Sequence, residues 1–270
     1  MRAIITGAGN MGRAISGALA ARGDEVVVML ARASDAGPER PRPGTLAPLD
    51  VGFEFSHATS LLSNVSLAIE AGCRSFVIGT TGWSEADEIG RALTTRMAEA
   101  DARAVVAPTF SLGAVLFGEL AEAAARLFGG FPDYDPYVFE QHRRSKPDRP
   151  SGTALAVASR LLPHLPSKRE ARLAEGSGAP DPGVLEIAAL RAGSHPGMHA
   201  VGFDGPGEAL ELRITARDRS AYVAGALLAA DWLTSHPDHI GISTFSALVR
   251  ERIAQTAQTA QPAQTDERND

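Results

Sequence analysis

The stretch AIITGAGNMG, residues 3–12, decides the fold of the first half of the chain. Its first four residues form an apolar, strand-like run, and a helical pattern follows at Met11–Ala21. Between them stands a glycine turn of the form GxGxxG, in the strand-turn-helix setting that makes this motif informative. The stretch therefore predicts the first unit of a parallel α/β sheet.

Each glycine of this turn has a separate predicted role. Gly7 permits the tight turn, Gly9 lets a ligand approach the backbone, and Gly12 lets the helix pack against the strand. The free N–H groups at the helix start, around Asn10 and Met11, favour an anion such as the diphosphate of a dinucleotide. A glycine-rich turn without a ligand is the alternative.

The end of the second predicted strand indicates which dinucleotide is bound. An acidic residue there would bind the ribose of NADH, but no acid occurs before Asp35. Arg32 and Ser34 instead suit the 2′-phosphate of NADPH, so the sequence favours NADPH over NADH. In the alternative, Arg32 is a solvated loop residue.

Two later turns are placed to line the nicotinamide end of the same cofactor. They are Gly79-Thr80-Thr81-Gly82 and Pro108-Thr109-Phe110, and each follows a strand-like run. The carboxyl ends of parallel strands are where open α/β sheets bind ligands. Ordinary connecting loops are the alternative for both turns.

The alternation of strands and helices changes after Pro108. Up to that point it is typical of a Rossmann-type doubly wound parallel sheet, with predicted helices that include Ser60–Ala71 and Glu85–Glu99. Beyond it, a loop at Leu165–Gly183 precedes three strand-like runs without intervening helices, which predicts a mixed or antiparallel sheet. We predict a dinucleotide-binding domain at residues 1–111 plus 218–253, a substrate-binding and oligomerisation α+β domain at 112–217, and a disordered tail at 254–270.

Composition limits the classes of partner. The chain has 26 Lys and Arg against 32 Asp and Glu, a net charge of −6, whereas nucleic-acid binding needs a basic surface. No apolar run reaches the ~20 residues that span a membrane, and the first residues do not resemble a signal peptide. The single cysteine, Cys73, is expected in the core. We expect a cytoplasmic enzyme that binds neither nucleic acid nor a membrane.

Metal binding is not expected either. His195 with His199, and His236 with His239, are spaced like pairs of metal ligands. Neither pair has a third ligand nearby in the sequence, and zinc sites need at least three protein ligands.

Residues 142–153, HRRSKPDRPSGT, form a basic cluster in this acidic chain. His142 is suited to donate a proton near neutral pH, and Lys146 adds charge or a second proton. Ser151, Gly152 and Thr153 begin a helix and offer hydroxyl and free N–H groups to a carboxylate. The cluster predicts a site for a small anionic substrate, and a solvated basic loop is the alternative.

The longer segment EQHRRSKPDRPSGTA, residues 140–154, resembles the E-x-H-H-x-x-K-x-D-x-P-S-G-T-A segment of the dihydrodipicolinate reductase family. GTTG at residues 79–82 and FSLG at 110–113 resemble two further motifs of that family. The tripeptide RAG at 191–193, with His199 and Arg219, also falls in register. The resemblance extends over roughly residues 1–249.

This resemblance implies hydride transfer from NADPH or NADH to a small, cyclic, unsaturated dicarboxylate. It implies that His142 is the general acid, assisted by Lys146, and that the turn at residues 151–153 binds a substrate carboxylate. It also implies substrate contacts from Arg143 and Arg219, and a homotetramer built through the sheet of the second domain.

Arg143 is the main departure from the family pattern, because it stands where the family has a second histidine. A guanidinium keeps the positive charge but cannot shuttle a proton at neutral pH. The change suits a ligand for a carboxylate, or a paralogue that reduces a related cyclic imine. A redox sensor that binds a dinucleotide without catalysis is a further alternative, against which the presence of both His142 and Lys146 argues.

Overall fold

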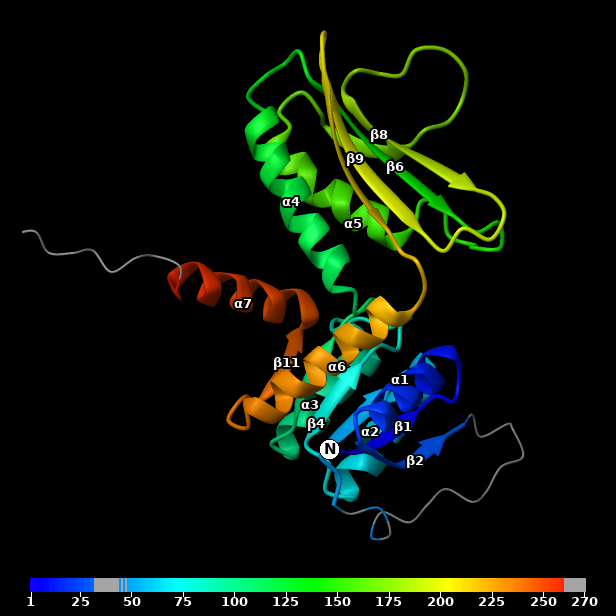
Figure 1. Cartoon of the computed structure of the whole chain (residues 1–270), viewed down its shortest axis with the longest axis vertical. Coiled ribbons are helices and arrows are strands. Elements are labelled where there is room, and N and C mark those ends of the chain that lie inside the picture. The colour runs from blue at the N-terminus through cyan, green and yellow to red at the C-terminus, as the bar shows by residue number, and fades with distance from the viewer. Residues whose placement is uncertain (32–43, 45, 47, 260–270) are drawn as a thin grey trace, which may run out of the picture. The chain divides into compact units, whose positions relative to one another are not determined.

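The computed structural model describes residues 1–31, 44, 46 and 48–259 (Figure 1). The chain divides into two compact units. The first unit comprises Met1–Ser111 and Ser220–Asp270, and the second comprises Leu112–Arg219. The second unit is therefore an insertion between two parts of the first.

The first unit contains a six-stranded sheet in the order β11-β5-β4-β3-β1-β2, and every strand pair in it is parallel. Its central strands β1, β3 and β4 are almost continuously buried, as expected for a sheet covered on both faces. The strands are β1 (Arg2–Thr6), β2 (Glu25–Leu30), β3 (Val51–Glu54), β4 (Ser75–Ile78), β5 (Arg103–Val106) and β11 (Gly241–Thr244).

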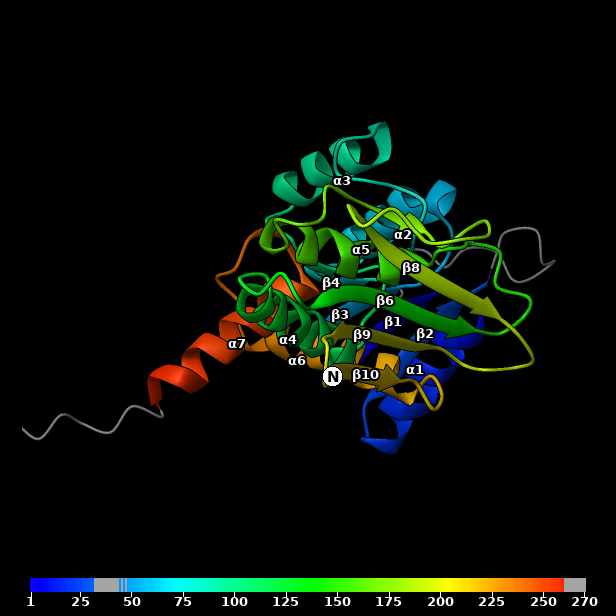
Figure 2. The ribbon, with the colours of Figure 1, turned by 90° about the horizontal axis from the view of Figure 1, so that it is seen from above.

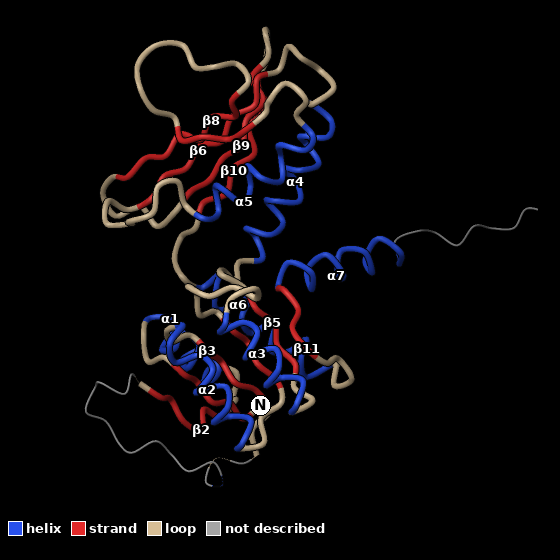
Figure 3. Tube along the Cα trace, turned by 180° about the vertical axis from the view of Figure 1, so that it is seen from behind, coloured by secondary structure: helices blue, strands red, loops and turns tan. Residues whose placement is uncertain are grey.

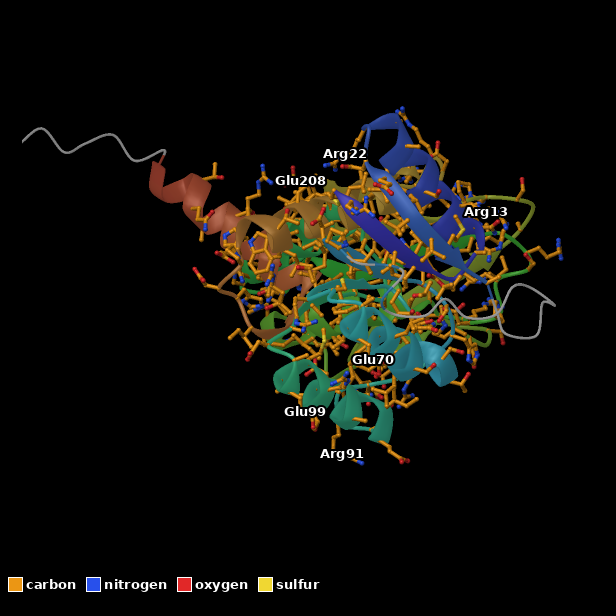
Figure 4. All side chains as sticks on the ribbon, turned by 90° about the horizontal axis from the view of Figure 1, so that it is seen from below. Arg13, Arg22, Glu70, Arg91, Glu99 and Glu208 are labelled. Atoms are coloured by element: carbon orange, nitrogen blue, oxygen red, sulfur yellow. The ribbon has the colours of Figure 1, made fainter. Side chains whose placement is uncertain are left out.

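Helices pack on both faces of this sheet, which confirms the predicted doubly wound fold (Figure 3). On one face α1 (Asn10–Ala21) contacts α6 (Ser220–Ser235), and on the other α2 (Ala58–Glu70) contacts α3 (Glu88–Glu99). An ion pair between Arg22 and Asp231, with Nη2 to Oδ1 at 2.8 Å, joins α1 to α6 (Arg22 is labelled in Figure 4). The last helix, α7, spans Phe245–Thr259.

Capping residues explain why two helices begin elsewhere than predicted. The predicted helix at Glu85–Glu99 starts only at Glu88, because Asp87 caps it by accepting from Gly90 N at 2.8 Å. The helix predicted from Ser60 starts at Ala58, where His57 accepts from Thr59 N. Cys73 is fully buried in the core of this unit, as expected.

The second unit is a five-stranded mixed sheet in the order β10-β9-β6-β8-β7. Helices α4 (Leu112–Phe128) and α5 (Gly152–Leu161) pack together with the sheet, and the short helix η2 (Leu162–His164) follows α5 (Figure 2). The strands are β6 (Asp135–His142), β7 (Glu170–Leu173), β8 (Val184–Arg191), β9 (Met198–Asp204) and β10 (Ala209–Thr215).

The secondary structure of two segments differs from the prediction. β7 lies inside the predicted loop Leu165–Gly183, where its EARL sequence carries little strand signal and pairing with β8 supplies the structure. The first residues of the predicted disordered tail, 254–259, belong to α7, because their alanine and glutamine residues suit a helix. No helix in the described part of the chain is long and apolar enough to cross a membrane.

Candidate active site

The glycine turn follows β1 in the first unit, and its backbone is closely packed at two of its three glycines. Gly7 has a φ of +104°, and a Cβ there would lie 2.2 Å from the Phe55 carbonyl oxygen. A Cβ on Gly12 would lie 1.9 Å from the carbonyl oxygen of Gly7. Gly9, by contrast, has open space beside it. This arrangement fits a turn that a diphosphate approaches at Gly9.

The start of α1 fits an anion as well. Gly9 is the N-cap and offers no side chain, and no acidic residue occupies the first turn, so the N–H groups near Asn10 and Met11 are not capped by a side chain. The exposed Arg13 side chain bonds the Ala8 carbonyl oxygen at 2.5 Å and keeps a positive charge beside the turn (Figure 4). Arg32, predicted to meet the 2′-phosphate, lies outside the described residues.

The turns after β4 and β5 lie at the same carboxyl edge of the sheet as the glycine turn. Gly79 admits no side chain, since its Cβ would lie 2.1 Å from the Phe55 ring, and Thr81 is exposed. Pro108 is exposed and Thr109 half-buried. The Phe110 ring is buried and packs on Phe55 and Phe245, so this residue has only its backbone to offer a cofactor.

A buried carboxylate, Glu54 at the end of β3, links several residues at this carboxyl edge of the sheet through hydrogen bonds. It accepts hydrogen bonds from the hydroxyl groups of Thr6 and Thr80, the latter at 3.0 Å. Ser56 and Asn64 donate to it as well. Burial raises the pKa of Glu54, and these hydrogen bonds partly offset the rise. The Thr80 hydroxyl is thereby engaged inside the protein, and its carbonyl oxygen accepts from Nε1 of Trp83 at 2.8 Å, which leaves the backbone N–H of Thr80 for a ligand.

The second unit brings the predicted proton donor into a buried cluster. His142 is the last residue of β6, and β9 beside it supplies His199. Their Nε2 atoms lie 3.3 Å apart, and the two rings meet edge to face at 69°. Oε2 of the fully buried Glu140 lies 3.3 Å from Nε2 of His142 and 3.5 Å from Nε2 of His199.

Glu140 also links this cluster to the start of α5. Its Oε1 accepts from the Ser151 amide at 3.0 Å and from Nη2 of Arg191, at the end of β8, at 2.7 Å. The same Arg191 nitrogen donates to the Asp148 carbonyl oxygen at 2.5 Å. Burial by itself would raise the pKa of Glu140, but the two imidazoles, the amide and the guanidinium hold it well below the usual range.

Ser151 is the N-cap of α5, as predicted, and its hydroxyl accepts from Ala154 N at 3.2 Å. The same hydroxyl lies 3.2 Å from Nε2 of His199. The Ser151 amide is bound to Glu140, and the Gly152 amide faces the Asp148 carboxylate. A substrate anion at this helix start would take the place of Asp148 at Gly152 and bind the Thr153 amide as well.

Lys146 forms an ion pair with Asp148, with Nζ to Oδ1 at 2.7 Å. Burial raises the pKa of Asp148, but Lys146 and backbone amides that include Gly152 outweigh it and lower the pKa overall. Arg143 is exposed, and Arg219 is exposed directly before α6. The structure thus joins His142 to Ser151 through shared partners, and leaves Arg143 and Arg219 at the surface.

Glu140, His142 and His199 also place three potential metal-ligand atoms within 4.8 Å of one another. The surrounding charge opposes a metal ion there, because a metal ion would add two or more positive charges at once. Arg191 already pairs with Oε1 of Glu140, and the adjoining loop is rich in Arg and Lys. A hydrogen-bonded acid–base cluster accounts for the same three side chains.

Sequence reasoning did not include three members of this cluster among the site residues. All three stand in the motifs that carry the family resemblance: Glu140 opens the segment at residues 140–154, Arg191 begins the RAG tripeptide, and His199 falls in register with it. The two-residue period of a strand was the available signal, because it places Glu140 and His142 on one face, and the structure shows that this face of β6 is buried.

The glycine turn of the doubly wound unit suits a dinucleotide, and the buried imidazole pair of the second unit suits proton transfer, as in a nicotinamide-dependent oxidoreductase. The comparisons specify the family: the model described as "Dihydrodipicolinate reductase, N-terminus" matches residues 1–110, and the one described as "Dihydrodipicolinate reductase, C-terminus" matches residues 113–246. The chain belongs to the dihydrodipicolinate reductase family, which uses NADH or NADPH.

Two curated relatives carry the name 4-hydroxy-tetrahydrodipicolinate reductase. The protein from Methanopyrus kandleri is 36% identical over 199 residues, which cover 73% of this chain and 71% of its own. The protein from Gluconobacter oxydans is 35% identical, with 72% of this chain and 76% of its own covered.

Two solved structures support the fold. Dipicolinate-bound dihydrodipicolinate reductase from Paenisporosarcina sp. TG-14 has a TM-score of 0.69 at 23% identity, covering 90% of this chain and 97% of that one. The C. glutamicum DAP dehydrogenase in complex with DAP has a TM-score of 0.52 at 14% identity, covering 94% and 98%. At these identities the likeness concerns the fold alone.

Proposed function

We propose that this protein reduces 4-hydroxy-tetrahydrodipicolinate, or the dihydrodipicolinate formed from it, with NADPH or NADH in the biosynthesis of diaminopimelate and lysine. The family membership supports the reaction class. The observation that carries the proposal in this chain is the buried cluster at the end of β6, where His142 stands beside a helix start that suits a carboxylate.

The cofactor assignment rests on the first unit. Gly7, Gly9 and Gly12 leave a turn that a diphosphate fits, and the start of α1 offers N–H groups to it. The backbones of the turns at residues 79–81 and 108–110 are proposed to line the nicotinamide end. Arg13 supplies a cation beside the turn, whereas the preference for NADPH rests on the sequence around Arg32.

The proton step is assigned to the second unit. The bound nicotinamide supplies a hydride, and its addition to a conjugated substrate leaves an electron pair that must be protonated. His142 donates that proton. The amides of Gly152 and Thr153 hold one substrate carboxylate, and Lys146 exchanges its pairing with Asp148 for the negative charge of the substrate.

Arg143 and Arg219 are proposed as further contacts for the two carboxylates. Both are exposed and carry a permanent charge, and a guanidinium can bind a carboxylate through two parallel hydrogen bonds. In this role Arg143 replaces a carboxylate-binding histidine without taking part in proton transfer.

We also propose a cytoplasmic homotetramer built through the sheet of the second unit. The helices cover one face of this sheet, and along β6 every second residue, from Tyr137 to Gln141, is only half-buried. Leu190 and Leu210 are exposed as well, at 44% and 37%. A second copy of the sheet would cover these side chains. Light scattering on the purified protein measures the mass directly.

Steady-state reduction of the product of the preceding synthase, with NADPH and NADH in parallel, tests the proposed reaction. We expect turnover with both cofactors and a higher kcat/KM with NADPH. If the folded protein oxidises neither cofactor in the presence of this substrate, the assignment is contradicted. If it instead reduces another cyclic imine, the protein is a paralogue with a different substrate.

A further inference from the structure

His199 has no role in the reaction as described so far, yet it contacts two groups that do. Its Nε2 atom lies 3.3 Å from Nε2 of His142 and 3.2 Å from Oγ of Ser151. It comes from β9, 57 residues along the chain from His142. The sheet therefore places a second imidazole beside the proposed acid.

The geometry leaves room for one proton between the two rings. A hydrogen bond between two imidazole nitrogens needs a proton on one of them and a lone pair on the other. Oε2 of Glu140 faces both nitrogens, is fully buried, and has no aligned hydrogen-bond donor among the described residues. A buried carboxylate oxygen without a donor is costly, and a positive charge on the imidazole pair offsets that cost.

The other charged groups around the two histidines already have partners of opposite charge. Arg191 is bound to Oε1 of Glu140, and Lys146 is bound to Asp148. One extra proton on the pair thus meets a carboxylate on one side and the hydroxyl of Ser151 on the other.

We propose that His142 and His199 act as a single acid that shares one proton between their two Nε2 atoms. This inference rests on the proposed reductase function. In the step, an N–H bond of the pair breaks, and a C–H bond forms with the electron pair that hydride addition leaves on the substrate. Both imidazoles end neutral, the carboxylate of Glu140 is unchanged, and water returns the proton.

The variant His199→Gln separates this role from a structural one. Glutamine places an amide near the position of Nε2 and still accepts a hydrogen bond, but it cannot take up the proton. We expect kcat to fall about tenfold or more, since general acids contribute about 10²- to 10⁴-fold, while both KM values change less than about twofold. The pH profile of activity should also change, because two rings no longer share the proton.

A matched control comes from the same β8–β9 connection. His195 accepts from the Gly197 amide through Nδ1 at 3.2 Å, and His195→Asn keeps an acceptor there, so wild-type kcat and pH profile are expected. A His199→Gln enzyme with wild-type kcat and pH profile would overturn the shared acid.

A second measurement uses the unaltered protein. In ¹⁵N-histidine NMR of the wild type, the Nε2 signals of both residues should move together through the same two titration steps. Two independent, single-step titrations would refute the proposal, even if His199→Gln fails to fold. Because this readout needs no substrate, it also distinguishes failure of the shared acid from failure of the reductase assignment.

Discussion

The ion pair between Glu140 and Arg191 gives the most quantitative prediction for the second unit. Glu140 is fully buried, the Arg191 side chain is 10% exposed, and their closest atoms are 2.7 Å apart. Replacing Glu140 by glutamine leaves the guanidinium buried without a counter-charge. Breaking a buried pair in this way costs about 3–5 kcal/mol, and the retained amide oxygen places Glu140→Gln near the lower end.

The pH dependence of this loss has a definite sign. The folded-state pKa of Glu140 lies below its unfolded value of about 4.3, so its contribution to stability is full above that pH. The contribution is lost as the pH falls through the folded-state value. The difference in the free energy of unfolding between wild type and Glu140→Gln should therefore be largest near neutral pH and shrink below about pH 4.

Urea denaturation followed by circular dichroism measures this difference. The control is Glu170→Gln in β7, whose partner Arg172 is exposed and whose ion pair is expected to contribute less than about 1 kcal/mol. A Glu140→Gln protein as stable as the Glu170→Gln control at neutral pH would refute the reasoning about the buried pair.

Three further changes test other parts of the account. Gly12→Ala should abolish cofactor binding, measured by fluorescence titration with NADPH, because its Cβ would lie 1.9 Å from the Gly7 carbonyl oxygen; wild-type affinity would contradict the packed turn. Burial raises the pKa of the Cys73 thiol to about 12, so iodoacetamide should label it only after unfolding, and rapid labelling of the native protein would oppose this. Ser151→Ala should cost about 1 kcal/mol through loss of the α5 cap, as seen by thermal melting, and an unchanged melting temperature would argue against the cap.

Local patterns were sufficient to predict the first unit. The turn at residues 7–12, the apolar strands and the helical periodicity between them lead directly to a parallel sheet with helices on both faces. Helix starts were less accurate, because a cap such as Asp87 is one of several acceptable residues in a polar stretch. β7 was missed because an edge strand can form by pairing alone, with little sequence signal.

The candidate site was only partly predictable, for a reason of topology. The segment at residues 142–153 contains the proposed acid and the helix start, and both were predicted from residue type and order; the structure confirms the helix start at Ser151. The placement of β6 between β9 and β8 brings His199 and Arg191 to the same point. Strand order depends on long-range packing, so the shared partners of His142 emerged only from the fold.

The central claim is that His142 provides the proton while the glycine turn of the other unit binds the cofactor. Measuring kcat and the dissociation constant for NADPH on one preparation of His142→Ala tests it most directly. We expect kcat to fall about 100-fold or more, with the NADPH dissociation constant within about twofold of wild type. An unchanged kcat, or a loss of NADPH binding as large as the loss of turnover, would contradict the account.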